Sequence, residues 1–193
     1  MAFRILQKDD PVLRKIASEV SLSDVGGNKI KNVIKSMRQA MDAEEDAVAI
    51  AAPQIGELLR IFAVSGRATG LRGDVLRRRS LSEGKRGDGK DKKDKVEKEK
   101  KPDLIFINPA IIKTSKKKNK LEEGCLSVRW LYGEVPRAEK VTVRAFDEKG
   151  RVFERGASGL MAQIFQHEID HLDGVLFIDK AENVKELTPR DGK

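Results

Sequence analysis

The chain has 193 residues, a length that suits one domain with an insertion or two small domains. Its 39 lysines and arginines against 31 aspartates and glutamates give a net charge of +8, which taken alone is typical of a protein that binds nucleic acid or another acidic surface. No apolar run approaches the roughly 20 residues that span a bilayer, and charges interrupt the segment Met1 to Val20, so we expect a soluble, cytoplasmic protein without a membrane helix or a signal peptide.

The chain opens with two predicted helices and a strand. Asp10 followed by Pro11 is typical of the start of a short helix, because the carboxylate caps it and proline suits its first position. A longer helix is predicted over residues 28–46, where apolar residues recur with the spacing of one helical face. These apolar residues are Ile30, Val33, Ile34, Met37 and Met41. A strand is expected over residues 58–64.

The positive charge is concentrated in the next segment, residues 66–101. This segment holds 14 basic and 7 acidic residues, a net charge of +7, which leaves a net charge of only +1 for the other 157 residues. It has no periodic apolar positions and no aromatic residue, so it cannot bury enough surface to offset chain entropy. We expect residues 1–193 to form a single domain interrupted by a disordered basic insertion at 66–101. The flanking strands can remain neighbours, because each doubling of a flexible loop costs only about 0.6 kcal/mol.

Strands dominate the part that follows, until a last helix. Short strands are expected over 104–107, 141–146 and 152–154, and the last two are joined by a turn. A helix over 159–171 places Leu160, Ile164, His167 and His171 on one face. A final strand at 174–177 leaves residues 181–193 beyond it. This order predicts an α+β fold in which antiparallel strands pack around a central C-terminal helix that carries an HExxH motif.

The chain has two histidines, His167 and His171, and both lie in that motif. Their spacing points both imidazoles to one side of a helix, at a separation that one divalent metal can bridge. Glu168 then lies beside the metal as a general base toward water. The structural alternative makes both histidines hydrogen-bonded helix residues. Ligation is favoured because the apolar stripe runs into them, and buried imidazoles need partners.

A catalytic metal usually has three protein ligands, and the single cysteine, Cys125, can supply the third. It follows Gly124, which permits close approach of the backbone to a ligand. The alternative is that Cys125 is a small buried apolar residue, as free cysteines often are. The combination of one cysteine and one histidine pair favours a metal site with Cys125, His167 and His171 as ligands.

Several stretches of the chain, in this order and at these separations, resemble peptide deformylase. They are AVAIAAPQ at 47–54, EGCLS at 123–127, VPRAEK at 135–140, QHEIDHLDG at 166–174 and GVLF at 174–177. The resemblance covers nearly all of the chain outside the basic insertion. Together these motifs are specific, whereas HExxH alone is not.

The resemblance implies an enzyme that removes the formyl group from the initiator methionine of nascent polypeptides and releases formate. Cys125, His167 and His171 would then hold Fe(II), which Zn(II), Ni(II) or Co(II) can replace. Glu168 would be the general acid and base, while Gln54 and the backbone N–H of Leu126 would stabilise the oxyanion. These roles agree with the chemistry, since a neutral amide donor aimed at a tetrahedral oxyanion stabilises the transition state.

The resemblance also implies how the N-formylmethionyl peptide binds. An extended peptide would pair with the backbone near Val48, Ala49 and Gly124, a mode that ignores downstream side chains. The methionine side chain would enter an apolar pocket formed by Val48, Leu160 and Ile164. Each of these three apolar residues, taken alone, is equally typical of the protein core.

Three features of the sequence call for separate expectations. The family usually has glycine where this chain has Ala47 and Ala49, so a positive φ at either position, or the Ala49 methyl group near the peptide, would weaken peptide binding. Arg129 and Trp130 follow the cysteine motif where relatives often have proline, so this loop is expected to be unusual. Glu123 and Arg137 are hypothesised to form a pair that supports the metal site, with simple surface ion pairing as the alternative.

Two other functions remain as alternatives. A metallopeptidase can use the same HExxH chemistry, although many such enzymes have His or Glu as the third ligand. A catalytically weakened relative that binds the ribosome or RNA is the second, because the insertion and Lys116 to Lys118 supply charge for phosphates. Bacterial relatives often extend a basic C-terminal helix onto the ribosome, so we hypothesise that the insertion at 66–101 replaces that helix as the anchor.

Overall fold

The computed structural model describes residues 4–68 and 101–187, so most of the segment expected to be a disordered insertion lies outside the described residues. The elements, in chain order, are η1 (Pro11–Arg14), α1 (Asn28–Ala43), β1 (Ala49–Ala51), η2 (Ala52–Ile55), β2 (Ile61–Val64), β3 (Leu104–Thr114), β4 (Lys118–Cys125), β5 (Val128–Ala138), β6 (Lys140–Phe146), β7 (Val152–Ser158), α3 (Gly159–Leu172), η4 (Phe177–Asp179) and β8 (Glu182–Glu186); η denotes a short 3₁₀ helix.

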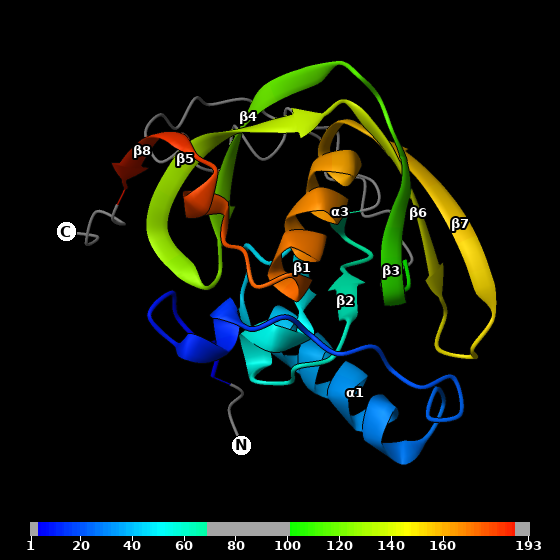
Figure 1. Cartoon of the computed structure of the whole chain (residues 1–193). Coiled ribbons are helices and arrows are strands. Elements are labelled where there is room, and N and C mark those ends of the chain that lie inside the picture. The colour runs from blue at the N-terminus through cyan, green and yellow to red at the C-terminus, as the bar shows by residue number, and fades with distance from the viewer. Residues whose placement is uncertain (1–3, 69–100, 188–193) are drawn as a thin grey trace, which may run out of the picture.

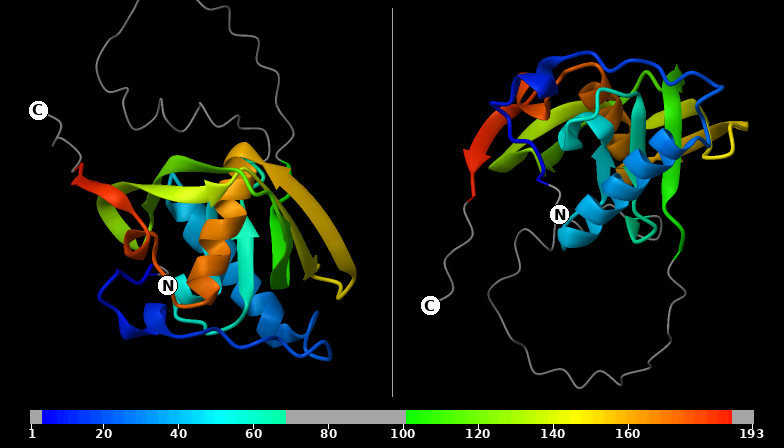
Figure 2. Two further views of the ribbon diagram at one scale, coloured as in Figure 1. Left: turned by 45° about the horizontal axis from the view of Figure 1, so that its top comes forward. Right: turned by 90° about the horizontal axis from the view of Figure 1, so that it is seen from below.

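Within the described residues, the strands form two sheets. The larger has the order β1-β2-β3-β6-β7 and the smaller the order β4-β5-β8, and every neighbouring pair is antiparallel. The predicted α+β class with antiparallel strands is therefore confirmed. Helix α3 lies between the two sheets, whereas α1 lies on the outer side of the larger one (Figures 1 and 2).

Strand β2 explains why the larger sheet has a helix on each face. Successive side chains of a strand point to opposite faces, and all four residues of β2 are buried. Phe62 and Val64 belong to the core cluster under α3, while Ile61 and Ala63 belong to the cluster under α1. The ring of Phe62 stacks on that of Phe106 in β3 at 4.4 Å between centroids. Both faces of the sheet are thus covered by apolar packing, which contributes most of the stability.

The two strands that flank the basic segment are direct neighbours, as expected. β2 pairs with β3, and Val64 lies opposite Leu104. Beyond them, the backbone N–H of Gly66 donates a hydrogen bond of 2.9 Å to Asp103 Oδ1. The described ends of the segment therefore meet, and the disorder predicted for its interior stays a prediction.

The smaller sheet was not predicted from the sequence, and neither was the short strand β1 of the larger sheet. Glu123 is the only fully buried residue among the eight of β4, and all five residues of β8 are exposed, so neither strand shows the apolar alternation of a half-buried strand. Strand β5 carries Val128 and Val135 into a third core cluster with Leu13 and Phe177. Pairing with β5 is what orders these polar strands.

Several predicted elements differ from those observed. Strand β2 begins at Ile61 and not at residue 58, and β3 and β7 continue beyond the predicted ends at residues 107 and 154. The strand expected at 174–177 is replaced by η4, because the Asp179 carboxylate accepts a hydrogen bond of 2.8 Å from the N–H of Leu176 and curls the chain. The helix predicted over 28–46 ends at Ala43. Beyond Ala43, the carboxylates of Glu44 and Asp46 bind Arg129 on β5 instead of continuing the helix.

The helices in residues 4–68 and 101–187 include none whose length and hydropathy suit a membrane span.

Candidate metal centre

Cys125 is positioned by the hairpin that joins β4 to β5. The register of the two strands shifts between Gly124 and Cys125, and Cys125 lies opposite Val128 across the turn formed by Leu126 and Ser127. Cys125 lies two residues after Glu123, so the alternation of β4 turns both side chains toward the histidines of α3.

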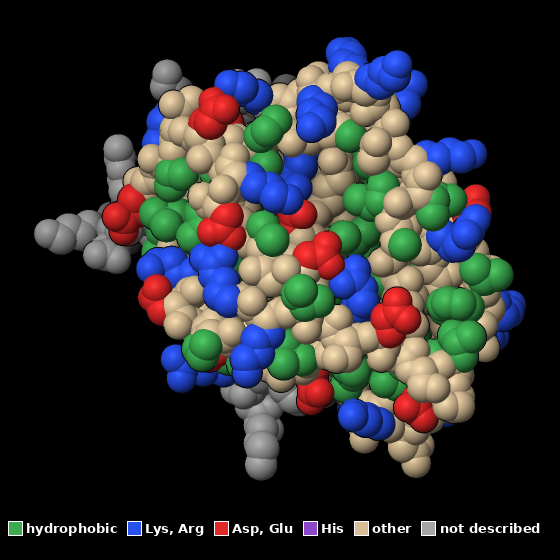
Figure 3. All heavy atoms as spheres, in the orientation of Figure 1, with side chains coloured by type: hydrophobic (Ala, Val, Ile, Leu, Met, Phe, Trp, Pro, Cys, Tyr) green, Lys and Arg blue, Asp and Glu red, His purple; other side chains and the backbone are tan. Residues whose placement is uncertain are grey.

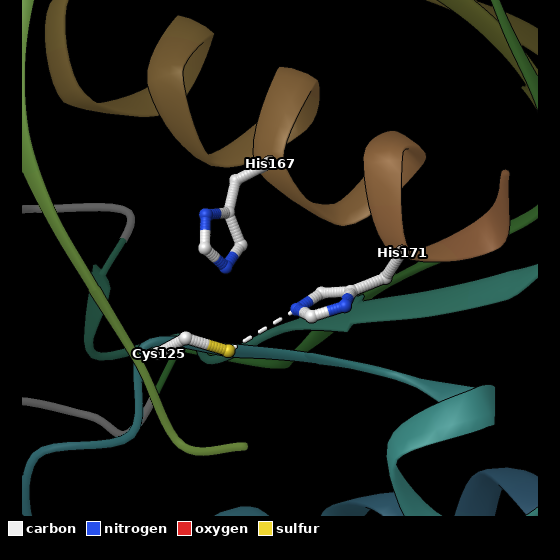
Figure 4. Close-up of side chains that lie close together, drawn as sticks. All are labelled: Cys125, His167 and His171. Carbon is white, nitrogen blue, oxygen red and sulfur yellow. Dashed lines mark hydrogen bonds between the residues drawn. The ribbon is translucent and has the colours of Figure 1, made fainter. Parts of the chain in front are cut away.

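The two histidines approach the cysteine from the C-terminal half of α3. His167 and His171 lie one turn apart, and their rings meet edge to face with centroids 4.9 Å apart. Cys125 Sγ is 3.2 Å from His171 Nε2 (Figure 4). One ligand atom from each of these three side chains lies within 4.8 Å of the other two. The structure therefore brings the three predicted ligands together.

The donor atoms of this cluster are of types that suit a divalent metal. Burial, with the neighbouring His167, lowers the pKa of His171 well below 6.5, so this imidazole is neutral and has a lone pair to donate. The Nδ1 atom of His171 is buried, and no described residue offers it a hydrogen bond. One sulfur and two nitrogen donors are a set that Fe(II), Zn(II), Ni(II) and Co(II) all accept. The residues present thus fit a metal ion.

Glu123 orients His167 from the neighbouring strand. Its Oε2 atom lies 2.9 Å from Nδ1 of His167, which leaves the Nε2 atom of that ring for the cluster. Arg137 on β5 binds the same carboxylate with two hydrogen bonds of 2.7 and 2.8 Å, and both side chains are almost fully buried. The hypothesised pair of Glu123 and Arg137 is therefore present, and it is not a surface ion pair.

The carboxylate of Glu123 is held in its charged form. Burial raises its pKa, but the hydrogen bonds from Arg137 and His167 outweigh burial and lower the pKa to about 2. Arg137 also binds Asp170 on α3, with 2.6 Å between Nη1 and Oδ2. Asp170 lies inside the HExxH motif, but no pattern in the sequence indicated its contact with Arg137.

Glu168 is buried beside the first histidine, where it is the residue predicted to be the general acid and base. Burial is the main reason that its pKa is raised from 4.5 to about 7. Its Oε2 atom is buried, and no described residue gives that atom a hydrogen bond. A carboxyl group with a pKa near neutrality can both accept and return a proton at physiological pH.

Gln54 is buried next to Cys125, although without the family resemblance its place in the sequence would suggest an ordinary surface residue. Its Oε1 atom accepts a hydrogen bond of 2.8 Å from the N–H of Ala51. Its amide Nε2 lies 3.0 Å from Ser127 Oγ and 3.5 Å from Cys125 Sγ. The amide therefore donates to the Ser127 hydroxyl and, at a longer distance, to the Cys125 sulfur. Ser127 is a buried contact that the sequence analysis did not single out.

The turn that follows Cys125 is tied to the N-terminal segment. Leu126 is buried, and its carbonyl oxygen accepts a hydrogen bond of 3.1 Å from Gln7 Nε2. Because this contact holds the peptide between Leu126 and Ser127 in the turn after Cys125, Gln7 is another supporting residue that sequence motifs did not indicate.

The residues predicted to bind substrate come from α3, from β4, and from β1 and the residue before it. Val48 packs against the core cluster that contains Leu160 and Ile164, and the latter two are buried. Ala49 lies in β1 and Gly124 in β4, which belong to different sheets. The structure thus gathers the three apolar residues, and their role in a pocket stays a prediction.

The two alanines that replace the usual glycines cause no backbone strain. Among the described residues other than glycine, positive φ angles occur at Asn108, Trp130 and Asn183, and neither alanine is among them. Ala47 and Ala49 are both buried within core clusters. The conformational cost that was expected for them is therefore absent.

A sulfur and two imidazoles gathered beside a buried carboxyl group, on an α+β fold, define a candidate centre for metal-dependent hydrolysis. The family model described as polypeptide deformylase matches residues 2–79 and 83–187. This match covers most of the chain, including every residue of the cluster. The chain belongs to the polypeptide deformylase family, which is metal-dependent.

Individual relatives agree with this assignment. A peptide deformylase of Thermomicrobium roseum is 35% identical over 184 residues, which cover 95% of this chain and 88% of the relative. A crystal structure of a peptide deformylase from Legionella pneumophila matches with a TM-score of 0.71 at 34% identity, over 95% of this chain and 88% of that one. The Met-Ala-Ser-bound class I type b deformylase from Acinetobacter baumannii matches with a TM-score of 0.71 at 28% identity, over 93% and 98% of the two chains.

Proposed function

We propose that this protein is a peptide deformylase that hydrolyses the N-formyl group of the initiator methionine of nascent polypeptides and releases formate. The observation that carries the proposal is the gathering of three ligand atoms within 4.8 Å beside the buried carboxyl group of Glu168. Membership of the deformylase family supports the same reaction. In this proposal α3 is the central scaffold, because its HExxH sequence supplies two of the ligands and the acid-base residue.

We further propose that Cys125, His167 and His171 hold one divalent ion, with Fe(II) as the resident metal and Zn(II), Ni(II) or Co(II) as replacements. The mixed sulfur and nitrogen donors support this group of metals. An ion held there supplies Lewis-acid activation of water and of the formyl oxygen.

The protein's own residues handle the proton and the developing charge. Glu168 accepts a proton from the attacking water, and its pKa of about 7 suits the return of that proton to the departing methionine nitrogen. Water and the formamide thus yield formate and a free amine. The Gln54 amide Nε2 and the backbone N–H of Leu126 donate hydrogen bonds to the formyl oxygen as it gains negative charge.

The peptide is proposed to bind in an extended form between β1 and β4. Backbone groups of Val48, Ala49 and Gly124 would pair with it, which explains how one enzyme can accept nascent chains of many sequences. Val48, Leu160 and Ile164 would surround the methionine side chain. The deformylase of Acinetobacter baumannii with Met-Ala-Ser bound supports a peptide of this kind as the ligand.

The test uses purified, iron-loaded protein kept under anaerobic conditions, with formyl-Met-Ala-Ser and Met-Ala-Ser as substrates. We expect stoichiometric formate from the first peptide, no cleavage of either peptide bond, and no reaction with the second. Peptide cleavage without formate would instead establish a metallopeptidase. Metal analysis of the same sample shows whether activity follows the content of bound ion.

A ribosome contact is proposed as a separate property. Figure 3 shows Lys and Arg side chains gathered at the upper rim of the molecule, over the turn between β3 and β4. The exposed lysines of this region are Lys113, Lys116, Lys117, Lys118 and Lys140. A hollow of about 530 Å³ beside them is also lined by hydroxyl groups, among them those of Ser115 and Thr142. Such a surface, together with the basic insertion, carries the positive charge needed to bind RNA phosphates. A ribosome contact of this kind would hold the enzyme in the cytoplasm, where nascent chains emerge.

A further inference from the structure

The loop before β1 and the hairpin that carries Cys125 are joined by one arginine. Arg129 Nη1 donates a hydrogen bond of 2.7 Å to Asp46 Oδ2, and Nη2 donates one of 2.6 Å to Glu44 Oε2. A third contact of 3.4 Å runs from Nη2 to Asp46 Oδ1. One guanidinium thus holds two carboxylates from a loop more than 80 positions earlier in the chain.

The residues on both sides of the Arg129 ion pair are close in sequence to the segments proposed to pair with the peptide. Asp46 is followed two residues later by Val48, at the entry to β1. Arg129 is the second residue of β5, next to the turn of Leu126 and Ser127 that follows Cys125. Because β1 and β4 belong to different sheets, backbone hydrogen bonds of one sheet do not set the distance between them.

Trp130, the neighbour of Arg129, is held in an unfavourable backbone conformation. Its φ is +64°, in the left-handed region that favours glycine. The Arg129 guanidinium carbon lies 5.4 Å from the centre of the Trp130 ring, within reach of a cation–π contact. The ring therefore shields one side of the guanidinium. A strained residue that persists beside a candidate site points to a functional constraint there.

We propose that Arg129 is a positioning residue: by binding Glu44 and Asp46 it sets the separation of the β1 and β4 segments that receive the formylated peptide. This inference rests on the proposed deformylase activity. The guanidinium does not touch the reacting atoms, so it acts on how well the peptide pairs and leaves the chemical step to Glu168 and Gln54.

The partial exposure of this ion pair supports a positioning role over a stabilising one. The Arg129 side chain is 24% exposed and that of Asp46 is 59% exposed. Ion pairs at such positions contribute only about 0–1 kcal/mol to folding. Breaking the contact therefore leaves the core intact and changes the geometry of the loop before β1.

The test measures kcat and KM of the metal-loaded full chain with formyl-Met-Ala-Ser and with formyl-methionine amide. For Arg129→Ala we expect KM for the tripeptide to rise about three- to tenfold, with kcat changed by less than about twofold. KM for the amide should change much less, because this substrate makes fewer backbone hydrogen bonds to β1 and β4. Arg144→Ala is the matched control, since Arg144 forms an exposed pair with Glu154 on β6 and β7.

Charge reversal provides an independent measurement. The double variant Asp46→Arg/Arg129→Asp restores an opposite pair and should recover a KM within about twofold of the native value, unlike either single variant. Raising the salt concentration should raise the native KM and leave that of Arg129→Ala nearly unchanged, because salt screens the pair.

Equal KM values for native protein and Arg129→Ala, or a loss confined to kcat, would overturn the positioning role. Absence of formate release by the native, metal-loaded protein would instead overturn the proposed function. If the Arg129 variants fail to fold, Trp130→Gly provides a second test of the proposal. Glycine suits the φ of +64°, so this variant should fold and raise the tripeptide KM by removing the stacked ring; an unchanged KM there would also count against the proposal.

Discussion

The chemistry of the site depends on a few side chains whose charges are set by their neighbours. Glu123 contacts both Arg137 and His167, so one buried carboxylate holds a ligand ring and is itself held in the charged form. Glu168, one residue from His167, lacks such a cation contact within the described residues and has a raised pKa. Two buried carboxyl groups therefore differ in protonation because their partners differ.

Removal of Arg137 tests whether its contact with Glu123 supports the site. Arg137→Ala leaves the Glu123 carboxylate buried without its cation, which should lower the free energy of unfolding by about 3–5 kcal/mol. His167 also loses its fixed orientation, so metal affinity should fall by about 10–100-fold. Thermal unfolding and competition with a chelator measure the two effects. Full activity with unchanged metal content would show that the pair does not support the site.

Glu168→Gln separates catalysis from metal binding. The variant keeps the shape of the side chain but cannot accept a proton, so deformylation should slow by about 10²–10⁴-fold. Metal content and melting temperature should stay close to the native values, because the carboxyl group makes no hydrogen bond through Oε2 within the described residues. Formate release measures the loss of activity, and metal analysis of the same preparation measures whether the metal content is unchanged. Metal loss in this variant would mean that Glu168 acts as a ligand.

At the scale of elements, α3 connects stability with function. One of its faces packs into the core through Phe165, and its C-terminal turns carry His167 and His171. The Phe165 ring lies 4.9 Å from that of Phe106 in β3. The larger sheet therefore positions the two imidazoles, while the smaller sheet supplies Cys125 through β4.

Truncation of Phe165 tests whether α3 is anchored in this way. Phe165→Ala should reduce the free energy of unfolding by about 3–5 kcal/mol, because it leaves a cavity between the helix and the sheet. It should also weaken metal binding, since the helix that carries both imidazoles loses its main contact. Val152→Ala, at an exposed position of β7, is the control and should change stability by less than about 0.5 kcal/mol. Urea unfolding of both variants makes the comparison.

At the scale of the whole molecule, the net charge of +8 divides into +7 for residues 66–101 and +1 for the other 157 residues. The core, the metal cluster and its supporting ion pairs all lie in the described residues outside 69–100. Since Val64 and Leu104 are paired neighbours, the two ends of the segment are already held together by the sheet.

A variant in which a short Gly-Ser link replaces residues 69–100 tests whether the fold and the candidate site are independent of the basic segment. The melting temperature and the cleavage of a short formyl-peptide should stay near the native values, because β2 and β3 pair without the segment. Co-sedimentation with ribosomes at low salt should weaken, since phosphate contacts depend on its positive charge. A variant with Lys116, Lys117 and Lys118 replaced by alanine shows how much the surface lysines contribute. Undiminished co-sedimentation in the deletion variant would reject the proposed anchor.

Local patterns in the sequence predicted the elements with apolar periodicity. The helix beginning at Asn28, the helix over Gly159–Leu172 and strands β2, β3 and β6 of the larger sheet bury apolar side chains, whereas the short strand β1 was not predicted. The smaller sheet could not be predicted in this way. β4 buries the charged Glu123, and β8 buries nothing, so their order comes from pairing with β5.

The sequence by itself determined the candidate donor set, because it contains one cysteine and two histidines four positions apart, and these donor types limit the metals that they could bind. It also determined the family, through motifs in a fixed order. Only the tertiary structure decided that Glu123 and Arg137 are a buried pair, that Gln54 faces Cys125, and that Arg129 reaches Asp46. These contacts join residues far apart in the chain, and their energies depend on burial and distance, which arise only when the two sheets and α3 pack together.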